Sequence, residues 1–324
     1  MTCTREGITQ VALEEIDKEY LCKTLDELPK SPMIPQHLLD AIAYKHLDLA
    51  YATQSSLQKL DLYLPPEAND ASENTAPVPT VIFIHGGGFI AGDKRDMQAS
   101  VYFGLLNHGY ALASVNYRLA PAAHFPDPVK DCKAAVRYLR AHAREYNLDA
   151  GRFAVVGNSA GAYMALMIAC SPNIGYLEDL STGDSQYGTE VRCCVSTYAP
   201  THFGILDAQK EQEGMEGPNA DDPHVPECQF MGAPISSLSE ELVAAASPAS
   251  YLTRQVPPLM LQAGTADQLV PYTQTVYFAN EAMQAAGEDK VNLKIVPGAG
   301  HHDPAFKRPA FLAQVLPFLD RYLK

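Results

Sequence analysis

Apolar and polar residues follow two kinds of strand pattern along this chain. Residues 46–51 and 57–64 alternate between apolar and polar side chains, which predicts an antiparallel hairpin at the edge of a sheet. Short, nearly continuous apolar runs follow, and such runs indicate strands that are buried on both faces. These runs comprise residues 81–84, 111–117, 152–156, 191–198, 259–263 and 291–296.

Segments with helical periodicity lie between several of these strands. Residues 127–146 carry Val129, Cys132, Val136 and Leu139 at helical spacing. Further helices are expected over residues 162–169, 272–286 and 303–322. Repeated strand–helix units place the strands mostly parallel and the helices on both faces of the sheet. We therefore predict an α/β fold, with residues 1–324 forming a single domain.

Two segments interrupt this alternation. Residues 1–45 hold helix-like pieces at 10–23 and 36–44 before any strand, and residues 202–250 form a long, Gly- and Pro-containing stretch between two strands. A long connection of this kind is unusual in a compact domain unless it forms a lid or a binding loop. We predict that both segments are cap elements above the carboxyl edge of the sheet. The alternative for 202–250 is a surface excursion without function.

Composition and charge exclude several classes of protein. The chain has 38 Asp and Glu against 24 Lys and Arg, a formal net charge of −14, which disfavours binding to nucleic acid and to strongly anionic substrates. No apolar run is long enough to span a membrane, and the acidic N-terminus does not resemble a signal peptide. The seven cysteines lack zinc-site spacing and are expected to be reduced thiols, so we predict a cytoplasmic location.

A candidate nucleophile lies between a strand and a helix. Gly157-Asn158-Ser159-Ala160-Gly161 has the G-x-S-x-G spacing of a nucleophile elbow, a tight turn that holds a serine hydroxyl above the end of a sheet. A serine needs a base to take its proton and a carboxylate to orient that base. Ser159 is therefore the predicted nucleophile.

The acid and the base are expected after two later strands, in the order in which this elbow normally meets them. Asp267 follows the strand at 259–263, and His301 follows the strand at 291–296. Asp303 is an alternative acid and His302 an alternative base. Asp267 itself is also compatible with a simple turn residue, because Asp is common in turns.

Backbone amides for the oxyanion of a tetrahedral intermediate are expected from two places. Gly87 and Gly88 lie in His85-Gly86-Gly87-Gly88 after a buried strand, where the lack of a side chain allows close approach. Ala160 follows the nucleophile directly and offers another amide. The glycines do not have the spacing of a dinucleotide-binding loop.

Together these motifs resemble the hormone-sensitive-lipase-like serine esterases of the α/β-hydrolase fold, and most closely the bacterial feruloyl and acetyl-xylan-type esterases. The similarity covers about residues 57–322 and includes Tyr117-Arg118-Leu119-Ala120-Pro121, expected to brace the sheet near the site. The resemblance implies an eight-stranded core, no cofactor and no metal. It also implies Ser159, Asp267 and His301 as triad, with Gly87, Gly88 and Ala160 as oxyanion donors.

The resemblance implies a serine carboxylesterase that acts on short-chain acyl or aromatic, feruloyl-type esters. Its expected partner is a small-molecule ester, with no nucleic acid and no membrane span; the oligomeric state stays open, a homodimer being one option. A peptidase on the same core and a non-catalytic small-molecule binder are the alternatives. Aromatic and sulfur-containing cap residues are expected either to line the pocket or to belong to the core; these are Tyr20, Phe203, Phe230 and Met231.

Overall fold

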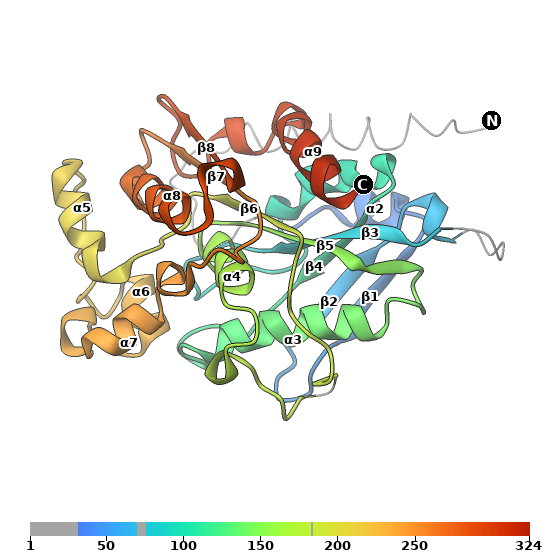
Figure 1. Cartoon of the computed structure of the whole chain (residues 1–324), viewed down its shortest axis with the longest axis horizontal. Coiled ribbons are helices and arrows are strands. Elements are labelled where there is room, and N and C mark those ends of the chain that lie inside the picture. The colour runs from blue at the N-terminus through green and yellow to red at the C-terminus, as the bar shows by residue number, and fades with distance from the viewer. Residues whose placement is uncertain (1–31, 70–75, 183) are drawn as a thin grey trace.

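An eight-stranded sheet forms the centre of the computed structural model, which describes residues 32–69, 76–182 and 184–324 (Figure 1). The strands lie in the order β1-β2-β4-β3-β5-β6-β7-β8. Their bounds are β1 Lys45–Ala50, β2 Lys59–Tyr63, β3 Val78–Ile84, β4 Ala111–Val115, β5 Leu148–Asn158, β6 Cys193–Thr197, β7 Leu259–Gly264 and β8 Val291–Val296. This is the predicted α/β-hydrolase fold.

The direction of the strands agrees with their hydrophobic patterns. β1 and β2 form the predicted antiparallel hairpin at one edge, and β2 is also antiparallel to β4. Every other pair in the sheet is parallel. The central strands β3 and β4 are buried along their whole length, as expected of strands covered on both faces.

Helices cover both faces of the sheet because neighbouring strand residues point in opposite directions. In β3, Ile82 and Ile84 belong to one core cluster, and Val81 and Phe83 belong to the other. The first cluster includes side chains of α3 Asp127–Ala141, α4 Ala160–Cys170 and α8 Tyr272–Ala286. The second includes side chains of α2 Gln36–Ala41, the 3-10 helix η3 Met97–His108 and α9 Pro309–Leu323.

Several predicted helix boundaries need correction. The helix predicted at 127–146 ends at Ala141, and the helix predicted at 36–44 ends at Ala41. The helix predicted at 303–322 is two elements, a 3-10 turn η9 Pro304–Phe306 and α9, which starts again at Pro309. Proline lacks the amide hydrogen that a continuous helix would use. Pro304 and Pro309 therefore each stand at the beginning of an element.

The twelve residues of η3 form a helix that the sequence pattern did not predict. Ten of them are buried, so the segment has no polar face from which a helical period could be recognised. Only its ends carry signals: the Asp96 side chain accepts a hydrogen bond from the Gln98 amide, and Gly109 closes the helix in the left-handed region.

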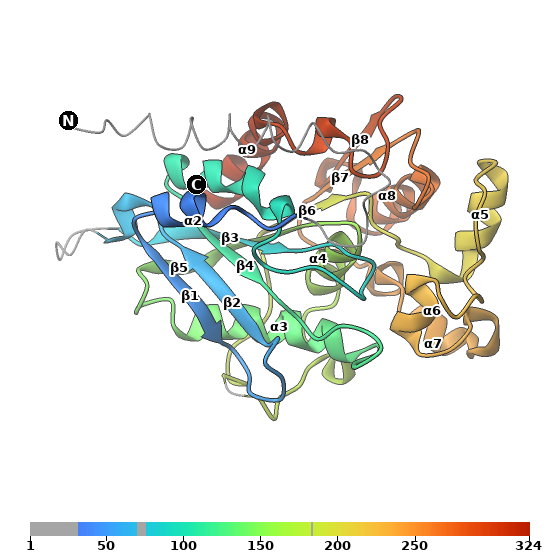
Figure 2. The same cartoon turned by 180° about the vertical axis from the view of Figure 1, so that it is seen from behind.

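Residues 202–250 contain turns over residues 213–225 and several short helices. These are η5 Phe203–Ile205, α5 Leu206–Gln212, α6 Pro226–Met231, η6 Ile235–Ser237, α7 Glu240–Ala245 and η7 Pro248–Tyr251. Figures 1 and 2 show α5, α6 and α7 gathered at the end of the molecule opposite the β1 edge. Of the N-terminal segment, α2 packs beside η3 through Leu38 and Leu39. The helix predicted at 10–23 lies outside the described residues.

The described part of the chain contains no helix that is long and apolar enough to cross a membrane. Within the same residues, no three His, Cys, Asp or Glu side chains are grouped as a metal site would require. The five cysteines in the described ranges are free and buried thiols, namely Cys132, Cys170, Cys193, Cys194 and Cys228.

Candidate active site

Ser159 lies in a strained turn between β5 and α4. Its backbone adopts φ 55° and ψ −126°, a region that a residue with a side chain rarely occupies. The flanking glycines explain how the turn closes. A Cβ on Gly157 would lie 2.3 Å from the Gly161 carbonyl oxygen, and one on Gly161 would lie 2.0 Å from the Ile84 oxygen. The turn therefore requires glycine on both sides of the serine.

The imidazole of His301 connects Ser159 to Asp267. His301 Nε2 lies 2.8 Å from Ser159 Oγ, and His301 Nδ1 lies 2.7 Å from Asp267 Oδ2. Because a carboxylate oxygen accepts, Nδ1 donates to Asp267 and leaves Nε2 to accept from the serine hydroxyl. All three side chains are at most 8% exposed. The structure thus brings together the three residues that the sequence predicted, in a site with little water to screen their charges.

Asp267 acts as a turn residue and as the partner of His301 at the same time. Its Oδ1 accepts hydrogen bonds from the amides of Leu269 and Val270, at 2.8 and 2.9 Å, which leaves Oδ2 directed to the imidazole. The alternative acid, Asp303, instead accepts from the Ala305 amide at the start of η9. The two acidic residues therefore occupy different structural positions.

His302, the alternative base, lies beside the site without replacing His301. Burial, with smaller contributions from the nearby His301 and Lys307, lowers the pKa of His302 to about 2. Its ring packs edge-on against the rings of His301 and Tyr198. His302 is therefore uncharged at neutral pH and contributes packing around the imidazole of His301.

The glycine-rich loop after β3 passes directly beside the nucleophile. A Cβ on Gly86 would lie 3.3 Å from Ser159 Cβ. Gly87 and Gly88 have φ values of 119° and 59°, which favour glycine, and the Gly87 carbonyl accepts from the Ala91 amide. Ala160 is the first residue of α4, where helix amides have no partner within the helix. Ala160 thus directly follows Ser159, and Gly87 and Gly88 continue the loop from Gly86, which lies beside Ser159.

Two buried residues that the sequence analysis did not identify hold this loop. The Gly86 amide donates to Gln98 Oε1 at 3.1 Å, and Gln98 Nε2 donates to Asp96 Oδ2 at 3.1 Å. Burial raises the pKa of Asp96 to about 7. The cap signal at Asp96 is visible in the sequence, but its connection to the glycine loop is made only by the fold.

The predicted bracing motif lies under the same loop. The Tyr117 ring stacks on His85 at 4.5 Å, and its hydroxyl donates to the His85 carbonyl at 3.0 Å. Arg118 binds Asp131 of α3 through two of its nitrogens. None of these side chains contacts the triad in the described structure, which is consistent with a supporting role.

Residues 202–250, called the cap below, pack on the rest of the fold through an aromatic cluster. Phe230 of α6 stacks on Phe89 at 4.2 Å, and Phe203 stacks on Tyr163 of α4 at 5.4 Å. All four rings are at most 2% exposed, so Phe203 and Phe230 belong to the core beneath the cap. Met231 is also buried, and Tyr20 lies outside the described residues.

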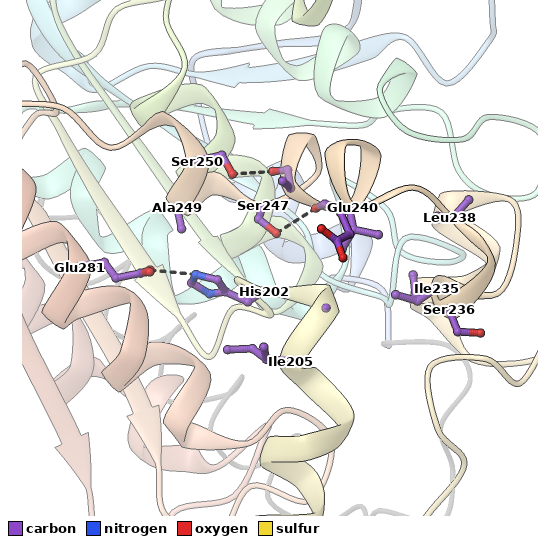
Figure 3. Close-up of a pocket in the computed structure, with 13 residues that line it drawn as sticks. His202, Ile205, Ile235, Ser236, Leu238, Glu240, Ser247, Ala249, Ser250 and Glu281 are labelled. Atoms are coloured by element: carbon purple, nitrogen blue, oxygen red, sulfur yellow. Dashed lines mark hydrogen bonds and ion pairs between the residues drawn. The ribbon is translucent and has the colours of Figure 1, made fainter.

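A separate open cavity of about 590 Å³ lies between the cap and α8 (Figure 3). Its lining includes apolar Ile205 and Val243 and a pair formed by His202 and Glu281, whose Nε2 and Oε2 atoms are 2.8 Å apart. Burial lowers the pKa of His202. No triad residue lines this cavity, so it is distinct from the surroundings of Ser159.

The sequence model of the BD-FAE family matches residues 60–282. A probable carboxylic ester hydrolase of Mycobacterium tuberculosis, LipM, is 25% identical over 248 residues, which are 76% of this chain and 54% of LipM. Esterase LipI of the same organism is 32% identical over 151 residues, 47% of this chain and 44% of LipI. The chain thus spans about half the length of these curated relatives.

Solved structures show the same fold. A truncated carbohydrate esterase from gut microbiota superposes with a TM-score of 0.72 at 25% identity, covering 87% of this chain and 96% of that one. Propionate-bound esterase 2 of Thermogutta terrifontis superposes with a TM-score of 0.64 at 20% identity, covering 87% and 93%.

Proposed function

Because this chain belongs to the BD-FAE family of α/β-hydrolases, we propose that it is a serine carboxylic ester hydrolase with Ser159 as nucleophile, His301 as base and Asp267 as acid. One observation carries the proposal. Two short hydrogen bonds, of 2.8 and 2.7 Å, join the three side chains in the order that nucleophilic catalysis needs. The relatives and structural neighbours with esterase names support the same reaction class.

In this mechanism, His301 Nε2 removes the proton of Ser159 as its oxygen attacks the ester carbonyl. Asp267 stabilises the imidazolium that forms, and the amides of Gly87, Gly88 and Ala160 bind the oxyanion. His301 then gives the proton to the departing alcohol, which leaves an acyl group on Ser159. A water molecule, deprotonated by the same imidazole, hydrolyses this acyl-enzyme. No step uses a metal or a cofactor.

Short-chain acyl or aromatic, feruloyl-type esters are the proposed substrates. The buried aromatic cluster of Phe89, Tyr163, Phe203 and Phe230 includes the residue directly after Gly88 and occupies space near the glycine loop, which favours the short-chain members of this range. The structural neighbour named as a carbohydrate esterase supports an ester of a carbohydrate.

Replacing the nucleophile tests the proposed reaction. In Ser159→Ala, kcat for p-nitrophenyl acetate should fall by about six orders of magnitude, because loss of the nucleophile removes the covalent pathway. A fluorophosphonate probe should label the wild-type chain and fail to label this variant. Undiminished turnover in Ser159→Ala would contradict the proposed mechanism, and absence of labelling in the wild type would favour a non-catalytic binder.

A further inference from the structure

Side chains hold two consecutive peptide groups of the glycine loop after β3. In the first, between His85 and Gly86, the carbonyl accepts from the Tyr117 hydroxyl at 3.0 Å, and the amide donates to Gln98 Oε1 at 3.1 Å. In the second, between Gly86 and Gly87, the carbonyl lies 2.8 Å from His85 Nδ1. A carbonyl oxygen only accepts, so His85 Nδ1 is the donor. The direction of both peptide groups is therefore set by these three side chains.

This arrangement leaves the amide of Gly87 available. A trans peptide group points its carbonyl and its N–H in opposite directions, so the Gly87 N–H points away from the His85 ring. Within the described residues, the Gly87 amide donates no backbone hydrogen bond. A free amide whose direction is fixed in advance is what an oxyanion donor requires.

Gln98 contacts the part of the loop that lies nearest to the nucleophile. A Cβ on Gly86 would lie 2.8 Å from Gln98 Oε1, 2.8 Å from the Asn158 carbonyl oxygen and 3.3 Å from Ser159 Cβ. Gly86 is therefore close to Gln98 and to the elbow at the same time. Glycine has no side chain to restrict its backbone, so the hydrogen bond to Gln98 supplies a restriction that the residue itself lacks.

Asp96 determines which end of the Gln98 side-chain amide faces the loop. Asp96 Oδ2 accepts from Gln98 Nε2 at 3.1 Å, and Asp96 Oδ1 accepts from the Gln98 backbone amide at 2.9 Å. Because an ionised carboxylate only accepts, the NH₂ group of Gln98 faces Asp96 and Oε1 faces the Gly86 amide. Both side chains belong to residues that are at most 3% exposed, so water competes little for these hydrogen bonds.

We propose that Gln98 is a positioning residue for ester hydrolysis, which acts through Gly86 to hold the loop in the conformation that directs the Gly87 amide at the oxyanion. This inference rests on the proposed function. The oxyanion forms only during the reaction, so a misplaced amide lowers kcat while KM changes little. A role limited to folding would lower stability without this division between kcat and KM.

Removing the acceptor tests this role. In Gln98→Leu, kcat for p-nitrophenyl acetate should fall by about tenfold or more, and KM should stay within about threefold of wild type. The assay is run at pH 8, above the pKa of Asp96 of about 7, so that this carboxyl is ionised. Urea denaturation shows whether the variant is folded under the assay conditions.

A paired exchange should restore the loop. In Asp96→Asn combined with Gln98→Glu, the new NH₂ group donates to the new carboxylate, whose second oxygen still accepts from the Gly86 amide. This double variant should recover most of the kcat that Gln98→Leu loses. Its comparison with the wild type tests the role even where Gln98→Leu does not fold. A role limited to folding predicts no such recovery, because two buried side chains are changed instead of one.

Gln58→Leu is the matched control. Gln58 is also buried, donates to Asp131 Oδ1 at 2.8 Å and accepts from backbone amides, but it lies in the turn before β2. Its kcat should stay within about threefold of wild type. A wild-type kcat in folded Gln98→Leu, an equal loss in Gln58→Leu, or a double variant as slow as Gln98→Leu would overturn the proposal. Failure of the wild type to hydrolyse p-nitrophenyl acetate would instead refute the proposed function.

Discussion

At the scale of single residues, the arrangement around Asp267 shows why this carboxyl suits the acid position. One oxygen is held by the Leu269 and Val270 amides, so the other is fixed toward His301. Asp303 lies only two residues beyond His301, yet its side chain is occupied by the Ala305 amide. The backbone amides that bind each carboxyl, more than its distance from His301 in the sequence, therefore determine which of the two carboxyls meets His301.

Asp267→Asn should lower kcat by roughly four orders of magnitude with little change in fold. Asparagine keeps an oxygen for the Leu269 and Val270 amides but presents an NH₂ group to His301. The imidazole would then carry its proton on Nε2 and could not accept the Ser159 proton. The measurement is kcat for p-nitrophenyl acetate, with circular dichroism to check the fold.

Asp303→Asn is the control for this substitution, because an asparagine oxygen can still accept from the Ala305 amide. Its kcat should stay within a factor of about three of wild type, since no triad contact changes. A loss in Asp303→Asn equal to that in Asp267→Asn would show that Asp267 is not the acid of this site.

The sequence predicted site residues that lie in motifs and did not predict the residues outside them that contact the glycine loop. Ser159, Asp267 and His301 follow strands in a recognisable order, and parallel strands bring their carboxyl ends to one edge. Gln98 lies outside these motifs, and its relation to the site depends on how η3 packs. No local pattern encodes that packing.

At the scale of elements, the elbow depends on the close approach of α4 to the end of β3. A Cβ on Gly161 would meet the backbone oxygens of Ile84 and His85, at 2.0 and 2.5 Å. Backbone atoms of a buried strand cannot move aside as a flexible side chain can. The first turn of α4 can therefore lie against β3 only with glycine at position 161.

Gly161→Ala should destabilise the protein by roughly 2–4 kcal/mol and reduce kcat at least tenfold, because the added methyl pushes the elbow away from the glycine loop. Urea denaturation gives the free energy of unfolding, and ester hydrolysis gives kcat. Gly175→Ala is the control: nothing lies within 4 Å of its added Cβ, so stability should change by less than about 1 kcal/mol. Equal effects in both variants would contradict the packing argument.

Elements with a clear pattern of apolar residues were predicted well, whereas η3 and the short helices of residues 202–250 were not. The edge hairpin and α3 carry clear periods, and the structure confirms them. The 3-10 helix η3 is buried on nearly all sides, so it has no period to detect. The cap helices are only six or seven residues long, too short for one amphipathic repeat to be distinguished from a loop.

At the scale of the whole molecule, strand order could be inferred only from the family resemblance. Hydrophobic runs predict which segments are buried strands. They do not predict that β3 lies between β4 and β5, because this order depends on the crossover connections between strands. The same crossovers bury His85, at the carboxyl end of β3, beneath the loop and against Tyr117. Burial of an ionisable side chain then links the fold to pH.

Acidification should reveal this link through His85. Burial lowers the pKa of His85 to about 4, below the ordinary value of 6.5, so the unfolded chain binds a proton more readily than the folded one. The contribution of neutral His85 to stability is therefore present above pH 6.5 and lost as the pH falls toward 4. Asp96 has the opposite sign: its pKa is raised to about 7, so its contribution is lost as the pH rises from about 4 to about 7.

Comparing the wild type with His85→Asn isolates the histidine, because the contribution of Asp96 is present in both proteins and cancels. Urea unfolding at pH 8 and pH 4.5 gives both free energies. The variant should be less stable at pH 8, since the stacking on Tyr117 is lost, and the difference should shrink by roughly 2–3 kcal/mol at pH 4.5. A difference that stays constant between the two pH values would show that His85 protonates equally well in the folded and unfolded chain, and would refute its burial as a neutral ring.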